Sequence, residues 1–415
     1  MSVLTKAGSG FAILAASALV LSGCTAAGQQ SCSDEEEGLL CIGTALPQTG
    51  SLAFLGPPEE AGVALAISDI NAADAGITLE VVLGDSGDTD NKAYETEIPR
   101  LLNAGVKAVL GAASSGVSLQ FIDQLVAANV IQFSPANTSA AFTTYEDNDL
   151  YFRTAPSDVL QGEVLGNWLA EDGHQTVAMM VLNDSYGTGL AQFTTEAFEA
   201  AGGGTVVAAP TYNTGDTNFT SQIGELLASD PDAIVLITFE EAKTIIPELL
   251  AQYPADQIYM VDGNLANFGE DFPAGTMTGA KGTLPGLDTN VIGEFTDRMN
   301  ANWVEEGNDD LDGVFAYGAE SYDAVILLVL AALAAGTTTD SLAIAAKLQE
   351  VSGGSGNGEK CTTFAECAAI INAGGVADYD GPSGPITLND VGDPTEASIG
   401  RYIYLEDNSY EPYAG

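Results

Sequence analysis

The chain has 415 residues, 46% of them hydrophobic, and its 58 acidic and 11 basic side chains give a net charge of −47 at pH 7. This length and hydrophobic content are enough for two domains, each with its own core. So negative a field repels nucleic acid and anionic membrane surfaces, which excludes a direct nucleic-acid-binding role. The acids are scattered, as on a solvated surface, and residues 85–90 lack the spacing and closing Glu of a calcium loop.

The N-terminal residues have the pattern of an export signal. Lys6 precedes a short apolar run at 11–21. A membrane-spanning helix needs about 20 apolar residues, so this run fits the removed part of a secretory signal. It ends in the letters LSGC at 21–24, which resemble the bacterial lipobox and imply a lipid on Cys24. An ordinary signal peptide with a chance cysteine is the alternative.

Four cysteines remain beyond the lipobox. Disulfides persist outside the cytoplasm, and four cysteines allow three pairings. The two local pairs, Cys32 with Cys41 and Cys361 with Cys367, are the simplest choice. Zinc is the alternative, but the cysteine spacings do not fit a zinc site, and the only histidine, His174, lies in a predicted turn. We expect no metal and no cofactor.

From residue 42 onward, apolar strands alternate with amphipathic helices, which predicts parallel sheets covered by helices. The first series predicts strands at 42–46, 79–83, 108–113 and 130–134, and helices at 57–71, 89–103 and 118–129. The second series predicts strands at 177–182, 206–209, 234–239 and 258–261, and helices at 187–201, 218–229 and 241–252. Helices at 291–306, 316–335 and 341–351 follow, and then short strands at 386–388 and 401–405.

The two series predict two lobes, with the chain passing between them more than once. In open α/β sheets, ligands bind beyond the carboxyl ends of the strands. Two such lobes that face each other form a cleft that closes by hinge motion. The apolar stretch 324–335 is too short to span a membrane, so we expect a buried helix there.

Seven short motifs follow one another along the chain: IGTALPQTG at 42–50, ALAISDIN at 64–71, AVLGAASS at 108–115, SPANTS at 134–139, FRTAPSD at 152–158, DSYG at 184–187 and DTNFTS at 216–221. Each motif alone is weak, but their common order is a strong signal. Together they resemble the bacterial branched-chain amino-acid-binding (Leu/Ile/Val-binding) protein family.

The resemblance implies the type I periplasmic-binding-protein fold, an α/β architecture with two doubly wound parallel-sheet lobes joined by a three-segment hinge. The hinge crossings are expected near Ser157, Pro285 and Pro385. Residues 353–384 depart from the family as a Gly-rich insertion. The chain then divides into a signal peptide at 1–23, a tether at 24–40, a first lobe at 41–156 and 285–385, and a second lobe at 157–284 and 386–415.

An α-amino acid needs hydrogen-bond donors for its carboxylate and a carboxylate for its ammonium group. Ser114 and Ser115 follow a strand and open a helix, where N–H groups and the helix dipole favour an anion. The resemblance implies that Ser115 and Thr138 hold the ligand's polar groups, with help from the backbone near Ala136 and Asn137. The alternative is that these side chains only cap helices.

The second lobe is expected to supply the negative partner. Asp262, which follows the strand 258–261, matches the acidic position of the family that binds the ammonium group. Glu240 stands where the family often has a tyrosine, which puts branched-chain specificity in doubt unless it is only a helix N-terminal acid. The resemblance also implies that Tyr186 forms an aromatic wall and that Leu55 or its neighbour Phe54 contacts the ligand from the first loop.

Catalysis is not expected. The sequence has no G-x-S-x-G elbow, Walker loop or G-x-G-x-x-G motif. The resemblance implies an extracytoplasmic, lipid-anchored monomer that binds a small amino acid, branched-chain or related, and delivers it to the permease of an ABC transporter. Two alternatives stay open: an amide, urea or aromatic acid as the ligand, and a sensor that presents its ligand to a receptor.

Overall fold

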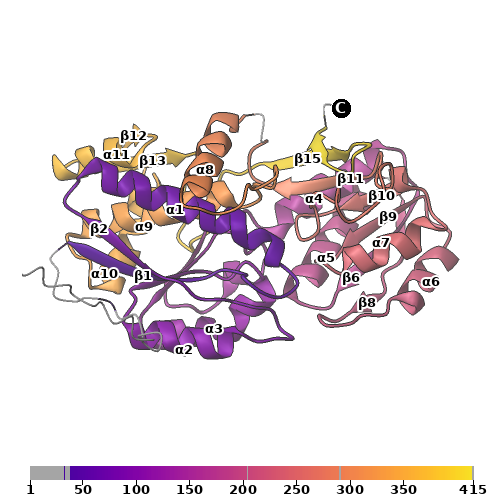
Figure 1. Ribbon diagram of the computed structural model, residues 1–415, viewed down its shortest axis with the longest axis horizontal. Helices are drawn as coiled ribbons and strands as arrows, with labels where there is room; N and C mark the ends of the chain where they lie inside the picture. The colour runs from indigo at the N-terminus through magenta and orange to yellow at the C-terminus, as the bar shows by residue number, and fades with distance from the viewer. Residues whose placement is uncertain (1–31, 33–37, 203, 289–290, 414–415) are drawn as a thin grey trace, which may run out of the picture. The chain divides into compact units, whose positions relative to one another are not determined.

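The computed structural model describes residues 32, 38–202, 204–288 and 291–413 (Figure 1). The predicted signal peptide and the lipid-bearing Cys24 lie outside these residues. Within them, every strand and helix of the two predicted series is present, with ends shifted by a few residues.

The first lobe is built on a five-stranded sheet in the order β2-β1-β3-β4-β5, and all neighbouring strands are parallel. Apolar residues of α1 and α9 bury one face of this sheet, and those of α2 and α3 bury the other (Figure 1). The elements of this lobe are β1 (Leu39–Ala45), α1 (Gly56–Ala73), β2 (Thr78–Val82), α2 (Tyr94–Ala104), β3 (Ala108–Gly111), α3 (Ser115–Ala127), β4 (Ile131–Ser134), β5 (Tyr151–Arg153), α8 (Gly293–Glu305), α9 (Gly318–Ala335) and α10 (Ser341–Val351).

The second lobe is built on a mixed sheet in the order β16-β15-β11-β10-β9-β6-β7, with β8 paired to β6. The strands from β11 to β7 are parallel, whereas β15 and β16 close the edge as antiparallel strands. The elements of this lobe are α4 (Asp158–Glu171), β6 (Thr176–Leu182), α5 (Ser185–Ala200), β7 (Thr205–Ala208), β8 (Thr211–Tyr212), α6 (Thr220–Ala228), β9 (Ala233–Ile237), α7 (Ala242–Leu250), β10 (Ile258–Met260), β11 (Lys281–Pro285), β15 (Ile399–Tyr404) and β16 (Tyr410–Pro412).

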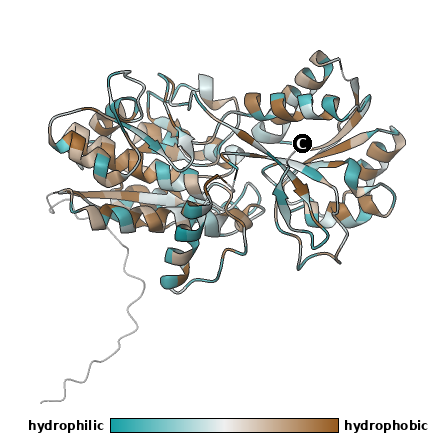
Figure 2. Cartoon of the chain, turned by 90° about the horizontal axis from the view of Figure 1, so that it is seen from above, coloured by the Kyte–Doolittle hydropathy of each residue, from teal (hydrophilic) through white to brown (hydrophobic). Residues whose placement is uncertain are grey.

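Hydrophobic residues alternate with hydrophilic ones along the helices, which is the pattern of helices with one buried face (Figure 2). Helix α9 is the exception because nearly all of it is buried. By length and composition it could cross a membrane, but 83% of its apolar window is covered by the protein. The expectation of a buried helix in this part of the chain is therefore confirmed.

The chain passes between the lobes after β5, after β11 and again before β15. Ile386 and Leu388 pack in the core of the first lobe, so the last passage begins later than residue 385. The strand predicted at 386–388 was wrong, since Leu388 forms only an isolated bridge with Pro394. Residues 386–388 are followed by a turn from residue 390, and no neighbouring strand pairs with them beyond this one bridge.

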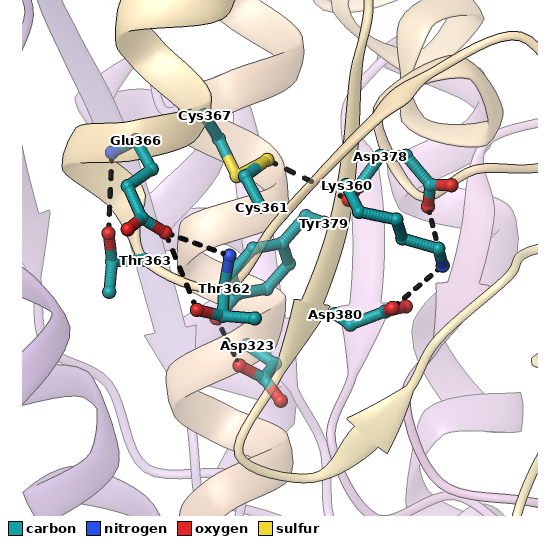
Figure 3. The surroundings of a disulfide bond; sticks show 10 residues. All are labelled: Asp323, Lys360, Cys361, Thr362, Thr363, Glu366, Cys367, Asp378, Tyr379 and Asp380. Atoms are coloured by element: carbon teal, nitrogen blue, oxygen red, sulfur yellow. Dashed lines mark hydrogen bonds and ion pairs between the residues drawn. A yellow bond between two sulfur atoms is a disulfide. The ribbon is translucent and has the colours of Figure 1, made fainter.

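The predicted insertion forms a small unit on the first lobe, made of β12 (Glu359–Cys361), α11 (Phe364–Asn372), β13 (Ala377–Gly381) and β14 (Gly384–Pro385). Within it, a disulfide joins Cys361 of β12 to Cys367 of α11 (Figure 3), and a second joins Cys32 to Cys41, as in the simplest pairing expected. The unit is fixed to α9 through the buried Asp323. This carboxylate accepts hydrogen bonds from the Tyr379 hydroxyl (2.5 Å) and from the Ser383 N–H (2.8 Å).

Candidate ligand-binding site

A pocket lies beyond the carboxyl ends of β3 and β4 in the first lobe and of β10 in the second. This is the edge at which parallel strands present ligand-binding loops. Both lobes contribute to its walls. The lining residues are Leu52, Leu55, Ala113, Ser114, Ser115, Ala136, Thr138, Tyr186, Phe239, Asp262, Gly263 and Tyr317.

The N-terminus of α3 forms the first-lobe end of the pocket. Ser114 is the N-cap residue, and its hydroxyl accepts a hydrogen bond from the Val117 N–H (3.3 Å). The Ser115 hydroxyl accepts one from the Ser139 N–H (3.2 Å). Backbone N–H groups of a first helical turn have no acceptor within the helix. With the helix dipole behind them, they can donate to a bound carboxylate.

The turn after β4 is held from within. The Ser134 hydroxyl accepts from the N–H groups of Ala136 (3.2 Å) and Asn137 (2.9 Å). The Asn137 amide donates to the carbonyls of Ala112 and Ala113, at 3.0 and 2.8 Å. Asn137 therefore stabilises the turn and, unlike Ala136 and Thr138, does not line the pocket. Sequence reasoning could not separate Asn137 from Thr138, because both carry polar side chains in one motif.

A buried ion pair stabilises the same turn from below. Arg153 is fully buried and donates to Asp393, with 2.6 Å between Nε and Oδ1. Its Nη1 also donates to the carbonyls of Asn137 (3.3 Å) and Ser139 (2.9 Å). The carbonyls of the turn are thus fixed, and the Thr138 side chain between them is directed to the pocket.

Asp262 forms the second-lobe end of the pocket, just beyond β10. Its Oδ1 accepts hydrogen bonds from the Tyr186 hydroxyl (2.7 Å) and from Gln161 Nε2 (2.9 Å), and its Oδ2 accepts one from the Tyr317 hydroxyl (2.7 Å). Burial raises the pKa of Asp262, and these three donors oppose the shift by stabilising the carboxylate. Burial beside this carboxylate raises the pKa of both tyrosines well above 10, so they remain donors.

The remaining walls are apolar. Phe239 stacks on Tyr186, with ring centroids 5.5 Å apart and planes inclined by 16°. Leu55 ends a single-turn helix at Ala53–Leu55 and is buried on the opposite side with Leu52. The pocket therefore combines a polar group from each lobe with apolar side chains, which suits a small molecule that carries both charges and an apolar body.

The structure does not bring Glu240 to this pocket. Its carboxylate lies 3.1 Å from Lys243 Nζ and is about half exposed, in a neighbouring pocket that also includes Phe54. Lys243 in turn lies 3.3 Å from the carboxylate of Asp271. The Glu240 N–H donates to the carbonyl of Ser51 (3.1 Å), a contact between the two lobes. The backbone of Glu240 therefore lies at the contact between the lobes, whereas its side chain pairs with Lys243.

Sequence reasoning did not assign three residues around Asp262: Gln161 and Tyr317, which donate to it, and Phe239, which lines the pocket. Phe239 was expected only as the end of a strand, and Gln161 was given no role. Tyr317 comes from the N-terminus of α9, far along the chain, and no pattern in the sequence indicates that its hydroxyl reaches Asp262.

Within the ranges that the structure describes, no group of three or more His, Cys, Asp or Glu side chains could hold a metal ion. His174 is bonded through Nε2 to the Tyr259 hydroxyl (3.0 Å), and burial lowers its pKa.

The parallel sheets, the passages between them and the pocket at their carboxyl ends define a solute-binding protein of the type I periplasmic-binding fold. Among solved structures, LivJ of Streptococcus pneumoniae in complex with isoleucine is similar with a TM-score of 0.69, at 22% identity over 90% of this chain and 99% of that one. A Rhodopseudomonas palustris solute-binding protein in complex with benzoate also gives 0.69, at 18% identity over 90% and 95%. These likenesses confirm the predicted fold.

Residues 40–377 match the periplasmic binding protein family, and the chain belongs to it. Leu/Ile/Val-binding protein homolog 2 of Brucella abortus is 28% identical over 75% of this chain and 82% of its own length. BasB of Halobacterium salinarum, a substrate-binding protein of a chemotactic signal transduction system, is 24% identical over 84% and 83%. The resemblance to branched-chain amino-acid-binding proteins is confirmed. Family members and structural neighbours are solute-binding proteins rather than enzymes.

Proposed function

We propose that this protein is an extracytoplasmic, lipid-anchored binding protein that captures a small amino acid, branched-chain or related, and delivers it to an ABC transporter permease. One observation carries the proposal. Asp262, with its three donors, and the N-terminus of α3, with Ser114 and Ser115, line the two ends of one pocket. An acceptor for ammonium and donors for carboxylate are the two groups that an α-amino acid requires.

The apolar wall supports the choice of side chain. Leu52, Leu55 and Phe239 offer no polar group to a ligand, and apolar contacts of this kind favour an aliphatic side chain. The curated relatives named for leucine, isoleucine and valine binding agree with such a ligand. A neutral amide or an aromatic acid carries no cation, so it would leave the buried Asp262 without a charged partner, which is costly.

The lipid anchor is part of the same proposal. It rests on the lipobox-like letters at 21–24 and on the tether that follows. Metabolic labelling with a radioactive fatty acid is expected to mark the wild-type chain, and Cys24→Ala is expected to remove the label. Labelling of the variant would contradict the anchor and leave the ligand assignment untouched.

A thermal-shift screen of the mature protein against amino acids, amides and aromatic acids tests the ligand class. A ligand at about 100 times its dissociation constant adds ~2.7 kcal/mol to the free energy of unfolding. We expect this shift with aliphatic amino acids. Stabilisation by amides or aromatic acids alone would contradict the proposal.

A second candidate partner is a signalling receptor, which BasB favours because it serves a chemotactic system and covers most of this chain. Both functions need the same cleft. Deletion of the gene separates them: loss of amino-acid uptake supports the permease, and loss of chemotaxis towards the amino acid with normal uptake supports the receptor.

A further inference from the structure

Asp158 is a buried acid behind the pocket, and neither of its carboxyl oxygens has a donor in normal hydrogen-bond geometry among the described residues. It opens α4, is fully buried, and has the Thr138 hydroxyl nearby, which favours its charged form. Its own N–H donates to the Thr138 carbonyl (2.7 Å), which ties it to the turn that lines the pocket.

Gln161, on the same helix, links Asp158 to the pocket. Its Nε2 donates to Asp262, whereas its Oε1 is buried without a partner. Residues three apart on a helix lie on one face. The first turn of α4 therefore places an unpartnered carboxyl and an unpartnered carbonyl next to the Asp262 carboxylate.

The two carboxyl groups differ in their donors. Asp262 accepts three well-formed hydrogen bonds, whereas Asp158 has only the nearby Thr138 hydroxyl to stabilise its charged form. Two buried carboxyl groups close together cannot both be ionised at low cost, and hydrogen bonds to the charged form decide which of them is. This geometry assigns the negative charge to Asp262 and a proton to Asp158.

The other charged and titratable groups around Asp158 agree with this assignment. Burial raises the pKa of Asp158 well above its usual value, and the Asp262 carboxylate adds to the shift, as does Asp184 more weakly. The Thr138 hydroxyl and the Arg153 guanidinium oppose it. Arg153 is already neutralised by its ion pair with Asp393.

We propose that Asp158 determines the charge of the cleft: it holds a proton in the ligand-free protein and releases it to solvent when an ammonium group binds Asp262. The inference rests on the proposed function, since the ammonium group belongs to the amino acid. While it is protonated, Asp158 can donate to Gln161 Oε1 and satisfy both buried groups. The ligand-free cleft then presents one carboxylate, that of Asp262, to the ammonium group.

Calorimetry with L-isoleucine in buffers of different ionisation enthalpy measures the protons released on binding. We expect the wild type to release a measurable fraction of a proton more than Asp158→Asn, a neutral side chain of the same shape. The variant is expected to keep its affinity within about fivefold, since it mimics the protonated acid. Glu163→Gln, an exposed change on the same helix, is expected to leave proton release unchanged. Equal proton release by the wild type and Asp158→Asn would overturn the proposal.

Stability of the ligand-free protein tests the same proton without any ligand. A carboxyl whose pKa is raised by folding binds a proton that the unfolded chain has lost, so its contribution to stability falls as pH rises. The melting temperature of Asp158→Asn is therefore expected to rise relative to wild type as pH increases above about 4, the pKa of an Asp in an unfolded chain. If Asp158→Asn folds poorly, Asp158→Ser is used instead, and its melting temperature is expected to show the same change with pH relative to wild type.

A constant difference in melting temperature across this pH range would overturn the proton on Asp158, whether or not a ligand binds. A rising difference in a protein that binds no amino acid would overturn the proposed function and leave the proton assignment standing. The two failures are therefore distinguishable.

Discussion

The two ends of the pocket use different chemistry. The first-lobe end consists of helix N–H groups and hydroxyls around Ser115 and Thr138 and has no ionised side chain in the pocket wall, whereas the second-lobe end is the Asp262 carboxylate. The first is stabilised from below by the ion pair of Arg153 with Asp393, and the second by neutral donors. This difference is what the proposed function requires of a zwitterionic ligand, with one charge held by each lobe.

The largest expected effect is on the second-lobe end. Asp262→Ala removes the partner of the ammonium group and leaves three donors without an acceptor. We expect the binding free energy of an amino acid to weaken by about 3 kcal/mol or more, the scale for a charge buried without its partner. Calorimetry measures this loss, and Glu248→Ala, on the surface of the same lobe, serves as the control. Unchanged affinity would sink the assignment of Asp262.

At the first-lobe end, the next largest effect is expected from loss of the ion pair between Arg153 and Asp393. Asp393→Ala leaves the Arg153 guanidinium buried and unpaired, which costs about 3 kcal/mol of folding stability. Amino-acid affinity should fall as well, because Arg153 holds the carbonyls on either side of Thr138. Chemical denaturation and calorimetry measure the two effects. Asp390→Ala, an exposed neighbour, is expected to change neither, and a fully stable Asp393→Ala protein would show that the ion pair does not stabilise the turn.

The insertion is expected to matter for stability but not for binding. Replacing Cys361 and Cys367 by Ser removes a short disulfide loop and is expected to cost about 2 kcal/mol of folding stability. Thermal denaturation under oxidising conditions measures this cost, because a reductant would break the Cys32–Cys41 disulfide as well. The two cysteines lie outside the pocket wall, so amino-acid affinity should stay unchanged. A loss of affinity would mean that the insertion controls the cleft.

The smallest expected effect isolates one donor at the second-lobe end. Tyr317→Phe removes one hydrogen bond to Asp262 and is expected to weaken amino-acid binding by about 1 kcal/mol. Tyr322→Phe, on the same helix, removes a hydroxyl bonded to Asp69 instead and is expected to leave affinity unchanged. Equal losses from both variants, measured by calorimetry, would attribute the effect to α9 rather than to the donor.

The sequence predicted most of the fold because its strands are apolar runs and many of its helices have one apolar face, as for β6 and α2. It also predicted the polar residues that directly follow strands, such as Ser115 and Asp262, since these positions meet at one edge of a parallel sheet. The Gly-rich insertion at 353–384 was noted only because it departs from the family pattern. Its strands are too short for a periodic pattern.

Long-range contacts could not be predicted. Tyr317 reaches Asp262 from another lobe, and the Arg153 pair joins residues 240 positions apart. Glu240 shows the converse case: it was expected in the cleft, but its side chain pairs with Lys243 and does not line the pocket. The direction of a side chain depends on neighbours that a local motif does not contain.

Calorimetry with L-leucine, leucinamide and the deaminated acid of leucine tests the central claim most directly. The amide lacks the carboxylate that the α3 N-terminus is expected to bind, and the acid lacks the ammonium group that Asp262 is expected to bind. The account predicts that leucine binds and that each analogue binds at least about a hundredfold more weakly, a loss of ~2.7 kcal/mol. Binding of the deaminated acid as tightly as leucine would contradict the role of Asp262 and the zwitterionic ligand together.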